Sequence, residues 1–321
     1  MSEAMAELRW HFHHLVVAGQ TDDPRLSERW RATFASRPAA PDTVPADLRL
    51  TLSSASELLP PPPRPPDFRQ GDLLAYYVED ESVIAHFPRF GQLHLDLSRG
   101  LTTGQLRPAA LDTYGVLEDL LAIALSPHLR RRGLFLIHAF AAARSGRAVL
   151  IVGAIGAGKT TTGLALLNAG WRLLANDSPI LRAPNADVLS YPGLLAAYPD
   201  TFARFPATQP LAAAAPAGQG RAKITAAAEA VWPGVWQDQA ACAAIVFPTI
   251  EARAEHVVER LAPPEALRRL LPHAAEQWDK AMLPAHLAVL GALVRSAPAF
   301  HLRLGPDVAA LPALFETFLA G

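Results

Sequence analysis

A glycine-rich segment that follows an apolar run constrains this chain more than any other part of its sequence. The run, residues 148–152, is bounded by glycines and is typical of a buried strand. Residues 153–160 then fit the pattern G-x-x-x-x-G-K-[ST] at every fixed position. Residues 161–168 carry three leucines and predict a helix, and Gly170 follows where a helix C-terminal cap favours glycine. The sequence therefore predicts a strand, a phosphate-binding loop and a helix in that order.

A loop of this kind binds phosphate through its backbone. Glycines allow successive N–H groups to point toward an anion, and the following helix presents its positive end to the same anion. Lys159 is expected to reach the terminal phosphates, and the Thr160 hydroxyl is expected to bind a magnesium ion. We therefore expect a nucleoside triphosphate to bind here. The predicted binding residues are Gly153, Ala154, Ile155, Gly156, Ala157, Gly158, Lys159, Thr160 and Thr161.

Polar residues lie next to this loop in the predicted topology. Residues 171–175 predict another strand, which ends in Asn176 and Asp177. A carboxylate at the end of a strand beside a phosphate loop suits magnesium, so Asp177 is the second predicted metal ligand. His138 lies in an apolar run, residues 134–140, that predicts the strand before the loop strand. Both a core histidine and a functional histidine remain open for that position.

These residues together resemble the HPr kinase/phosphorylase family and related HPr-kinase-like proteins. That family's pattern is a strand with histidine, a turn and strand into the phosphate loop, a helix, and an apolar strand that ends in acidic residues. Here His138 precedes Lys159 by 21 positions, and Asn176 follows Lys159 by 17. The resemblance implies an α/β fold with a mixed sheet, similar to the nucleotide domain of phosphoenolpyruvate carboxykinase.

The resemblance also implies an activity, with one departure from the family pattern. It implies magnesium- and ATP-dependent phosphorylation of a hydroxyl, usually a serine on a small protein or peptide, with His138 close to the reacting groups. Asn176 stands where the family has the aspartate that takes the proton of the acceptor hydroxyl. A neutral carboxamide cannot accept that proton. The candidate catalytic residues are therefore Asp177 and His138, which could replace that base, and Asn176 itself.

Three functions remain open from the sequence. The leading hypothesis is an ATP-dependent kinase whose acceptor is a peptide or small protein, because related stand-alone proteins accompany ribosomally made, modified peptides. The second is a nucleotide-binding regulatory or interaction protein with weak or no turnover, because of Asn176. The third is a simple ATPase. Residues 190–206 lack the metal-binding glutamate of true HPr kinases, so HPr itself is not the expected acceptor. Members of the family are often oligomeric, so the resemblance also allows for a homo-oligomer.

The rest of the chain divides into two predicted domains. Strand patterns at residues 8–18, 48–53 and 73–98 predict a β-rich N-terminal domain, residues 1–113. Residues 114–321 are then the HPr-kinase-like nucleotide-binding domain. It is predicted to open with a helix at 114–129, capped by Asp112 and ended or kinked by Pro127. Arg130–Arg132 are expected at its solvated end, with phosphate binding as the alternative.

Three further segments carry expectations. A proline run at residues 60–66 predicts an extended spacer. An Ala/Gly/Pro stretch at residues 212–220 predicts a mobile loop that could cover the phosphate site. Lys223 follows it and is expected at the surface, with a phosphate contact as the alternative.

Composition excludes several classes of partner. The net charge of −1 argues against a nucleic-acid partner, which normally requires a basic surface. The single cysteine, Cys242, cannot form an internal disulfide and indicates a reducing compartment. The first residues lack the pattern of a signal peptide, and no segment has the length and apolarity of a membrane span. We therefore expect a soluble, cytoplasmic protein without a membrane partner.

Overall fold

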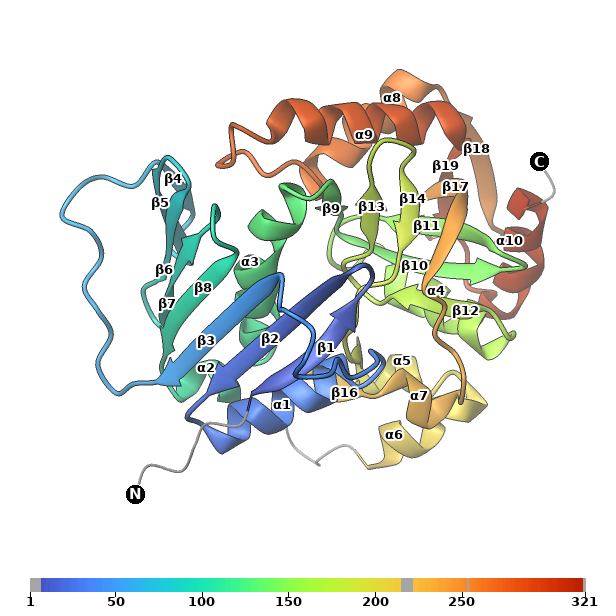
Figure 1. Cartoon of the computed structure of the whole chain (residues 1–321). Helices are drawn as coiled ribbons and strands as arrows, with labels where there is room; N and C mark the ends of the chain where they lie inside the picture. Colours follow the sequence, from blue (N-terminus) through green and yellow to red (C-terminus); the bar gives the residue numbers. More distant parts are fainter. Residues whose placement is uncertain (1–6, 215–221, 253, 320–321) are drawn as a thin grey trace. The chain divides into compact units, whose positions relative to one another are not determined.

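The computed structural model describes residues 7–214, 222–252 and 254–319. These residues form two compact units (Figure 1). The first unit contains Met1–Arg132 together with Glu276–Lys280, and the second contains Gly133–Ala275 and Ala281–Gly321. The sequence placed a domain boundary between residues 113 and 114, whereas the units divide after Arg132. Most of the predicted mobile loop at 212–220 lies outside the described residues.

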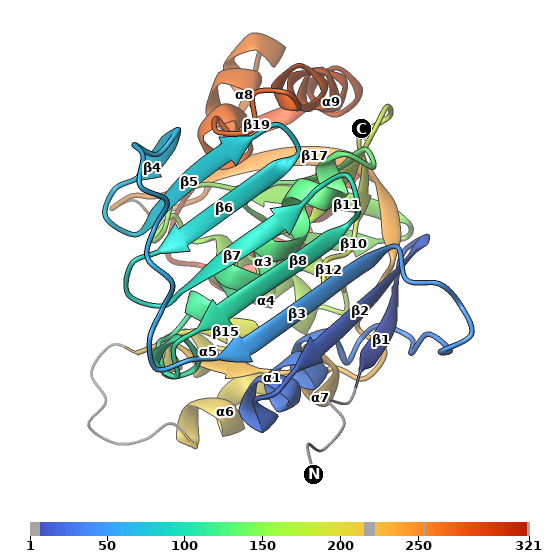
Figure 2. The same cartoon turned by 60° about the vertical axis from the view of Figure 1, so that its left-hand side comes forward.

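An eight-stranded sheet forms the first unit, in the order β1-β2-β3-β8-β7-β6-β5-β4 (Figure 2). The five strands from β4 to β8 pair antiparallel, so the predicted meander is confirmed. β2 and β8 both run parallel to β3, and α1 (Pro24–Phe34) connects β2 to β3. The strands are β1 (Leu8–Phe12), β2 (Leu15–Thr21), β3 (Leu48–Ser54), β4 (Phe68–Gln70), β5 (Leu74–Glu79), β6 (Ser82–Phe87), β7 (Gly91–Asp96) and β8 (Leu101–Leu106).

The single strand predicted for residues 8–18 is wrong. The chain turns at His13, which has a φ of 58°, and β1 and β2 form an antiparallel hairpin around it. Trp10 of β1 then packs against Trp30 and Phe34 of α1, with ring centroids 6.3 and 4.3 Å apart. All three side chains are buried, so this aromatic cluster fixes α1 on the sheet.

The helix predicted for residues 114–129 is present with different ends. Asp112 is the last residue of a short helix, α2 (Ala109–Asp112), and α3 (Val116–Arg130) is preceded by Gly115 as its N-cap. Pro127 lies inside α3 and does not end it. Leu125, Leu129 and Arg130 on either side of Pro127 are fully or almost fully buried. Tertiary packing therefore outweighs the helix-breaking tendency of the proline.

The solvated arginine end predicted for this helix is also wrong, because Arg130 is buried. Its side chain is only 2% exposed, and its Nε donates to Oδ2 of Asp279 at 2.8 Å. Arg131 donates to the same carboxylate oxygen at 3.0 Å. The ring of Trp278 lies 5.1 Å from the Arg130 guanidinium and stacks on Tyr76 at 4.5 Å. Residues 276–280, called the anchor segment below, thus belong to the core of the first unit.

A second buried ionisable group in α3 predicts how stability changes with pH. The Thr102 hydroxyl donates to the Ala124 carbonyl at 3.0 Å, so it accepts a hydrogen bond from Nε2 of His128 at 2.9 Å. Burial, followed by the charges of Arg132 and Arg131, lowers the pKa of His128 to about 4. The ordinary pKa of histidine in an unfolded chain is about 6.5. His128 is therefore neutral in the folded protein at pH values where the unfolded chain is already protonated.

We expect the free energy of unfolding to fall as the pH falls between these two pKa values. Below about pH 6.5 His128 binds a proton in the unfolded chain but stays neutral in the folded protein. This difference lowers the free energy of unfolding by about 2 kcal/mol at pH ~5. Urea denaturation of wild type and His128→Gln at pH ~7.5 and ~5 measures this loss, with the exposed His14→Gln as control. Equal pH dependence in wild type and His128→Gln would contradict the assignment.

The second unit contains a nine-stranded mixed sheet, so the predicted α/β class with a mixed sheet is confirmed. β17, twelve residues long, runs parallel to β11 and β19 and antiparallel to β14. β10 pairs antiparallel with β11 and β12, as the predicted hairpin requires. The strands are β9 (Leu134–Leu136), β10 (Ala139–Arg144), β11 (Arg147–Val152), β12 (Arg172–Ala175), β13 (Ile180–Arg182), β14 (Asp187–Leu189), β17 (Gln239–Ile250), β18 (Val257–Leu261) and β19 (Ala299–Leu304).

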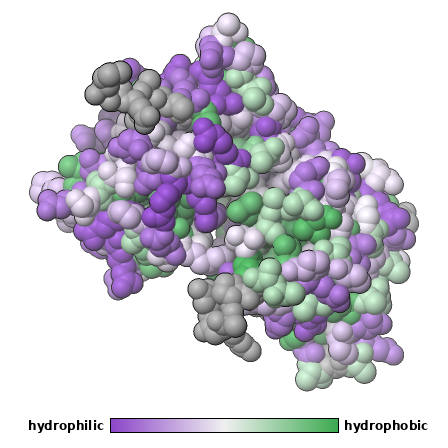
Figure 3. Space-filling model, turned by 90° about the horizontal axis from the view of Figure 1, so that it is seen from below, coloured by the Kyte–Doolittle hydropathy of each residue, from purple (hydrophilic) through white to green (hydrophobic). Residues whose placement is uncertain are grey.

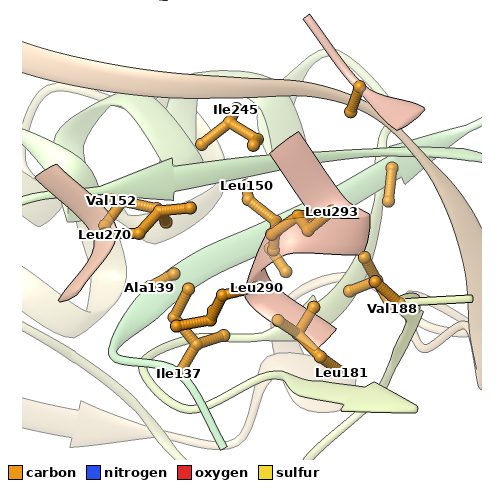
Figure 4. Packing of buried hydrophobic residues seen from close by; sticks show 14 of the residues in the cluster. Ile137, Ala139, Leu150, Val152, Leu181, Val188, Ile245, Leu270, Leu290 and Leu293 are labelled. Atoms are coloured by element: carbon orange, nitrogen blue, oxygen red, sulfur yellow. The ribbon is translucent and has the colours of Figure 1, made fainter. Parts of the chain in front are cut away.

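Helices cover both faces of this sheet. Alternate residues of β11 point to opposite faces: Leu150 packs in one hydrophobic cluster with α8 and α9, and Ile151 packs in another with α4 and α10. Figure 4 shows the first cluster, with Leu290 and Leu293 of α9 near Leu150. The helices are α4 (Lys159–Asn168), α5 (Pro199–Phe202), α6 (Gln209–Ala213), α7 (Ala228–Val231), α8 (Pro263–Leu270), α9 (Leu283–Ser296) and α10 (Leu311–Leu319), and a small hairpin is formed by β15 (Leu195–Ala197) and β16 (Ile224–Ala226).

Two further observations concern the hydropathy of the helices and of the surface. Among the described residues, no helix combines the length and apolarity that crossing a bilayer requires. The face shown in Figure 3 carries hydrophilic residues with smaller hydrophobic areas between them.

Candidate functional site

The loop between β11 and α4 has the strand–loop–helix arrangement that the sequence predicts. β11 ends at Val152, and α4 begins at Lys159. Gly156 and Gly158 have φ values of +84° and +100°, a region that side-chain-bearing residues rarely adopt. A Cβ atom on Gly158 would also lie 2.6 Å from Cδ1 of Leu304. The positive φ therefore favours glycine at position 158, and a larger residue there would also require the Leu304 side chain to shift.

The other predicted binding residues lie along this loop and the first turn of α4. Ala154, Ile155 and Gly156 are exposed, and the Ile155 side chain is 87% exposed. Thr160 and Thr161 are half-buried. The backbone of Ala157 donates to the Ala154 carbonyl at 3.2 Å and closes the turn. The exposed part of the loop is thus its middle, where a phosphate ligand of such a loop would approach.

Lys159 is held against the loop by its own backbone. Its Nζ donates to the carbonyl oxygens of Gly153 and Ala154 at 2.6 and 3.2 Å, and the residue is 8% exposed. Burial lowers the pKa of Lys159, the carboxylate of Asp177 raises it, and the ammonium of Lys223 lowers it further. The loop lysine therefore lies within electrostatic range of an acidic and a second basic side chain.

His138 lies in a break between two strands. The single strand predicted for residues 134–140 is wrong: β9 ends at Leu136 and β10 begins at Ala139. The break leaves the His138 side chain 39% exposed, and its Nδ1 lies 3.3 Å from Oδ1 of Asp177. The backbone N–H of Ala139 donates to the Asp177 carbonyl at 3.0 Å, which fixes the two segments together. His138 is accordingly paired with Asp177 rather than packed in the core.

Asn176 and Asp177 follow β12, as the sequence predicts. The Asp177 side chain is 57% exposed. Oδ1 of Asn176 is buried and has no hydrogen-bond partner among the residues that the structure describes. A buried acceptor without a partner is costly, so Asn176 places an unsatisfied acceptor at this end of β12.

Two basic residues near the site were missed or undervalued by the sequence analysis. His273, at the end of the 3-10 helix η2 (Leu271–His273), accepts the backbone N–H of His138 on its carbonyl at 2.7 Å. The positive charge of Lys223 lowers the pKa of Lys159, and Nζ of Lys223 lies 5.7 Å from the centroid of the Tyr198 ring. No motif marks His273, because it comes 114 positions after Lys159 in the chain. Only the fold shows that it lies beside His138.

The residues present fit a magnesium ion by their chemistry. Magnesium in nucleotide sites prefers one or two protein oxygen donors together with phosphate oxygens and water. The Thr160 hydroxyl at the start of α4 and the exposed carboxylate of Asp177 are donors of this kind. No cluster of three or more His, Cys, Asp or Glu side chains suited to a metal occurs within residues 7–214, 222–252 and 254–319. The donor set therefore fits an ion that phosphate also binds, not an all-protein metal centre.

Comparisons with known proteins give similarity to solved structures, and that similarity is distant. No family model matches the chain, and no curated protein matches it. Among solved structures, the Hpr(Ser) kinase/phosphatase from Coxiella burnetii is similar with a TM-score of 0.29 and 15% identity, over 58% of this chain and 88% of that chain. A TM-score of this size does not place the chain in that family, so the case for a function rests on the residues of the site.

Proposed function

We propose that this protein is a magnesium-dependent phosphotransferase that moves the terminal phosphoryl group of ATP to a hydroxyl group. The observation that carries the proposal is the pairing of His138 with Asp177, within electrostatic range of the lysine of a complete phosphate-loop motif. A phosphate-binding loop alone holds a nucleotide, whereas a histidine–carboxylate pair beside it can also take a proton from an acceptor.

We assign complementary tasks to the side chains of the site. Nδ1 of His138 lies 3.3 Å from Oδ1 of Asp177, and we assign to this pair the task of taking the proton of the acceptor hydroxyl. Asn176 precedes Asp177 at the end of β12, and we assign it the task of orienting that hydroxyl. Lys159 and the loop backbone hold the transferred phosphate and its neighbour. Magnesium, held by Thr160 and Asp177, would neutralise charge on the phosphate oxygens.

The acceptor class follows from the resemblance to HPr-kinase-like proteins. It is a serine-type hydroxyl on a peptide or small protein, and precursors of ribosomally made, modified peptides are the preferred candidates. Incubating the purified protein with magnesium and ATP, alone and with peptides encoded beside its gene, tests this proposal. A mass increase of one phosphate on a peptide supports it. ATP hydrolysis that no acceptor suppresses would indicate an ATPase instead.

One observation favours a second function. The residue at position 176 is a neutral asparagine, where the resembling family has a carboxylate that takes the proton. Loss of a general base typically costs a factor of about 100 to 10,000 in rate. A nucleotide-binding regulatory protein would bind ATP tightly and show no transfer to any acceptor under the same assay, which separates the two functions.

Restoring the carboxylate tests the assignment of Asn176. We expect Asn176→Asp to raise phosphotransfer about tenfold or more, because a carboxylate at this position can take the hydroxyl proton itself. The rate of the variant should also depend less on His138 than the rate of wild type does. Single-turnover kinetics with radiolabelled ATP measure both effects, with the exposed Asn168→Asp as matched control. Rates of Asn176→Asp equal to wild type would contradict this assignment.

A further inference from the structure

His273 is fixed beside His138 by the backbone. Its carbonyl oxygen accepts the backbone N–H of His138 at 2.7 Å. The two imidazole rings are inclined by only 26°, and their centroids are 6.2 Å apart. A phosphate group at the edge of the His273 ring can accept a hydrogen bond from it in the ring plane and still lie close to His138. The second histidine therefore lies at the same end of the site as the His138–Asp177 pair.

The charges around His273 come from several elements. Burial lowers the pKa of His273, and positive charge on His138 and Lys159 lowers it further. Lys159 in turn interacts with Asp177 and Lys223, so the local field includes one carboxylate and two ammonium groups. Without an anion, these surroundings favour a neutral imidazole. A bound triphosphate would bring several negative charges to the same place and reverse that preference.

We propose that His273 contacts the terminal phosphates of the bound nucleotide, and that its imidazole takes up one proton from solvent when they bind. The identity of the ligand rests on the proposed function, whereas the anion site itself rests on the geometry of His273 and His138. On protonation both ring nitrogens of His273 become donors, so the residue adds a charge-assisted hydrogen bond to those of the loop. The proton comes from the buffer, and no bond of the nucleotide is broken in this step.

A purely structural task for His273 makes a different prediction. If the residue only supplies its backbone carbonyl to His138, then changing its side chain leaves phosphate binding unchanged. The proposal instead requires the imidazole, so side-chain variants that keep the backbone bond distinguish the two cases.

Calorimetry with inorganic tripolyphosphate tests the proposal without any need for turnover. The full-length protein is titrated in a magnesium-containing medium at pH ~7.5, in buffers of different ionisation enthalpy, which gives the number of protons taken up. We expect uptake in wild type, loss of that uptake in His273→Gln, and about tenfold weaker binding, the value of one charge-assisted hydrogen bond. The difference between wild type and variant removes the titration of the ligand itself. The exposed His14→Gln serves as matched control.

A second variant separates charge from proton uptake. His273→Arg carries a permanent positive charge, so it should bind tripolyphosphate about as tightly as wild type but without uptake of a proton. Unchanged uptake in His273→Gln, or unchanged affinity, overturns the proposal, and so does absence of tripolyphosphate binding by wild type. Binding with the expected uptake but no transfer from ATP to any acceptor would instead overturn the proposed function and leave His273 as part of an anion site.

Discussion

Lys159→Ala is expected to lower the affinity for magnesium-ATP more than 100-fold. Lys159 is the one charged side chain of the loop motif, and at 8% exposure it already lies out of water. Its ammonium is held by two loop carbonyls, which would lose a donor in the variant. Removing a buried, hydrogen-bonded charge that meets a ligand charge costs about 3 kcal/mol or more, which corresponds to more than 100-fold.

Isothermal titration calorimetry with a non-hydrolysable ATP analogue measures this loss. Lys280→Ala is the matched control, because Lys280 is exposed and lies in the first unit. Lys159→Arg is informative as well: it keeps the charge but not the compact ammonium, so binding should be recovered only in part. If Lys159→Ala retains its circular dichroism spectrum and binds ATP within about threefold of wild type, the phosphate loop is not the nucleotide-binding site.

The parts of the fold that the sequence predicts are those governed by local patterns. The apolar run before the loop, the glycines within it and the leucines after it predict β11, the turn and α4 with boundary errors of one or two residues. Alternation likewise predicts the meander from β5 to β7. In each case the signal lies within a window of about ten residues, because neighbours in the chain are also neighbours in the element.

The features that the sequence did not predict depend on contacts between distant segments. The break at His138 has no glycine or proline to mark it, and it forms because backbone groups of His138 and Ala139 pair with His273 and Asp177 instead of a strand. Pro127 was expected to end or kink a helix, yet α3 continues past it, because the residues around it are buried. The sequence could name His138 and Asp177 as candidates through spacing to the loop, but it could not show that they touch or that His273 joins them.

The burial of Arg130 also depends on a contact between distant segments. Three consecutive arginines at a helix end are typical of a solvated surface, and composition offers no reason to single out the first. The partner, Asp279, comes 149 positions later, in the anchor segment. The anchor segment contains a glutamate, a tryptophan and an aspartate, and their spacing matches neither a strand pattern nor a helix pattern. The burial of the C-terminal end of α3 could therefore not be predicted from the sequence.

Asp279→Asn is expected to lower the free energy of unfolding by about 3 to 5 kcal/mol, because it leaves a buried guanidinium without a countercharge. Arg130 is 2% exposed and Asp279 is 3% exposed in its side chain, so water cannot replace the lost carboxylate. Arg131 loses the same carboxylate and keeps its ion pair with Glu81, which is 52% exposed. The cost should therefore approach the value of breaking a buried pair.

Asp112→Asn is the matched control, because it removes a carboxylate from an ion pair with Arg25 in the same unit. The side chains of that pair are 55% and 60% exposed, so the loss should stay below about 1 kcal/mol. Urea denaturation of the full chain, followed by circular dichroism, compares the two variants. The double variant Arg130→Met with Asp279→Leu should recover most of the loss, since an apolar pair needs no desolvation of charge. Equal losses for Asp279→Asn and Asp112→Asn would show that the anchor segment is held by the stacking of Trp278 on Tyr76 rather than by the ion pair.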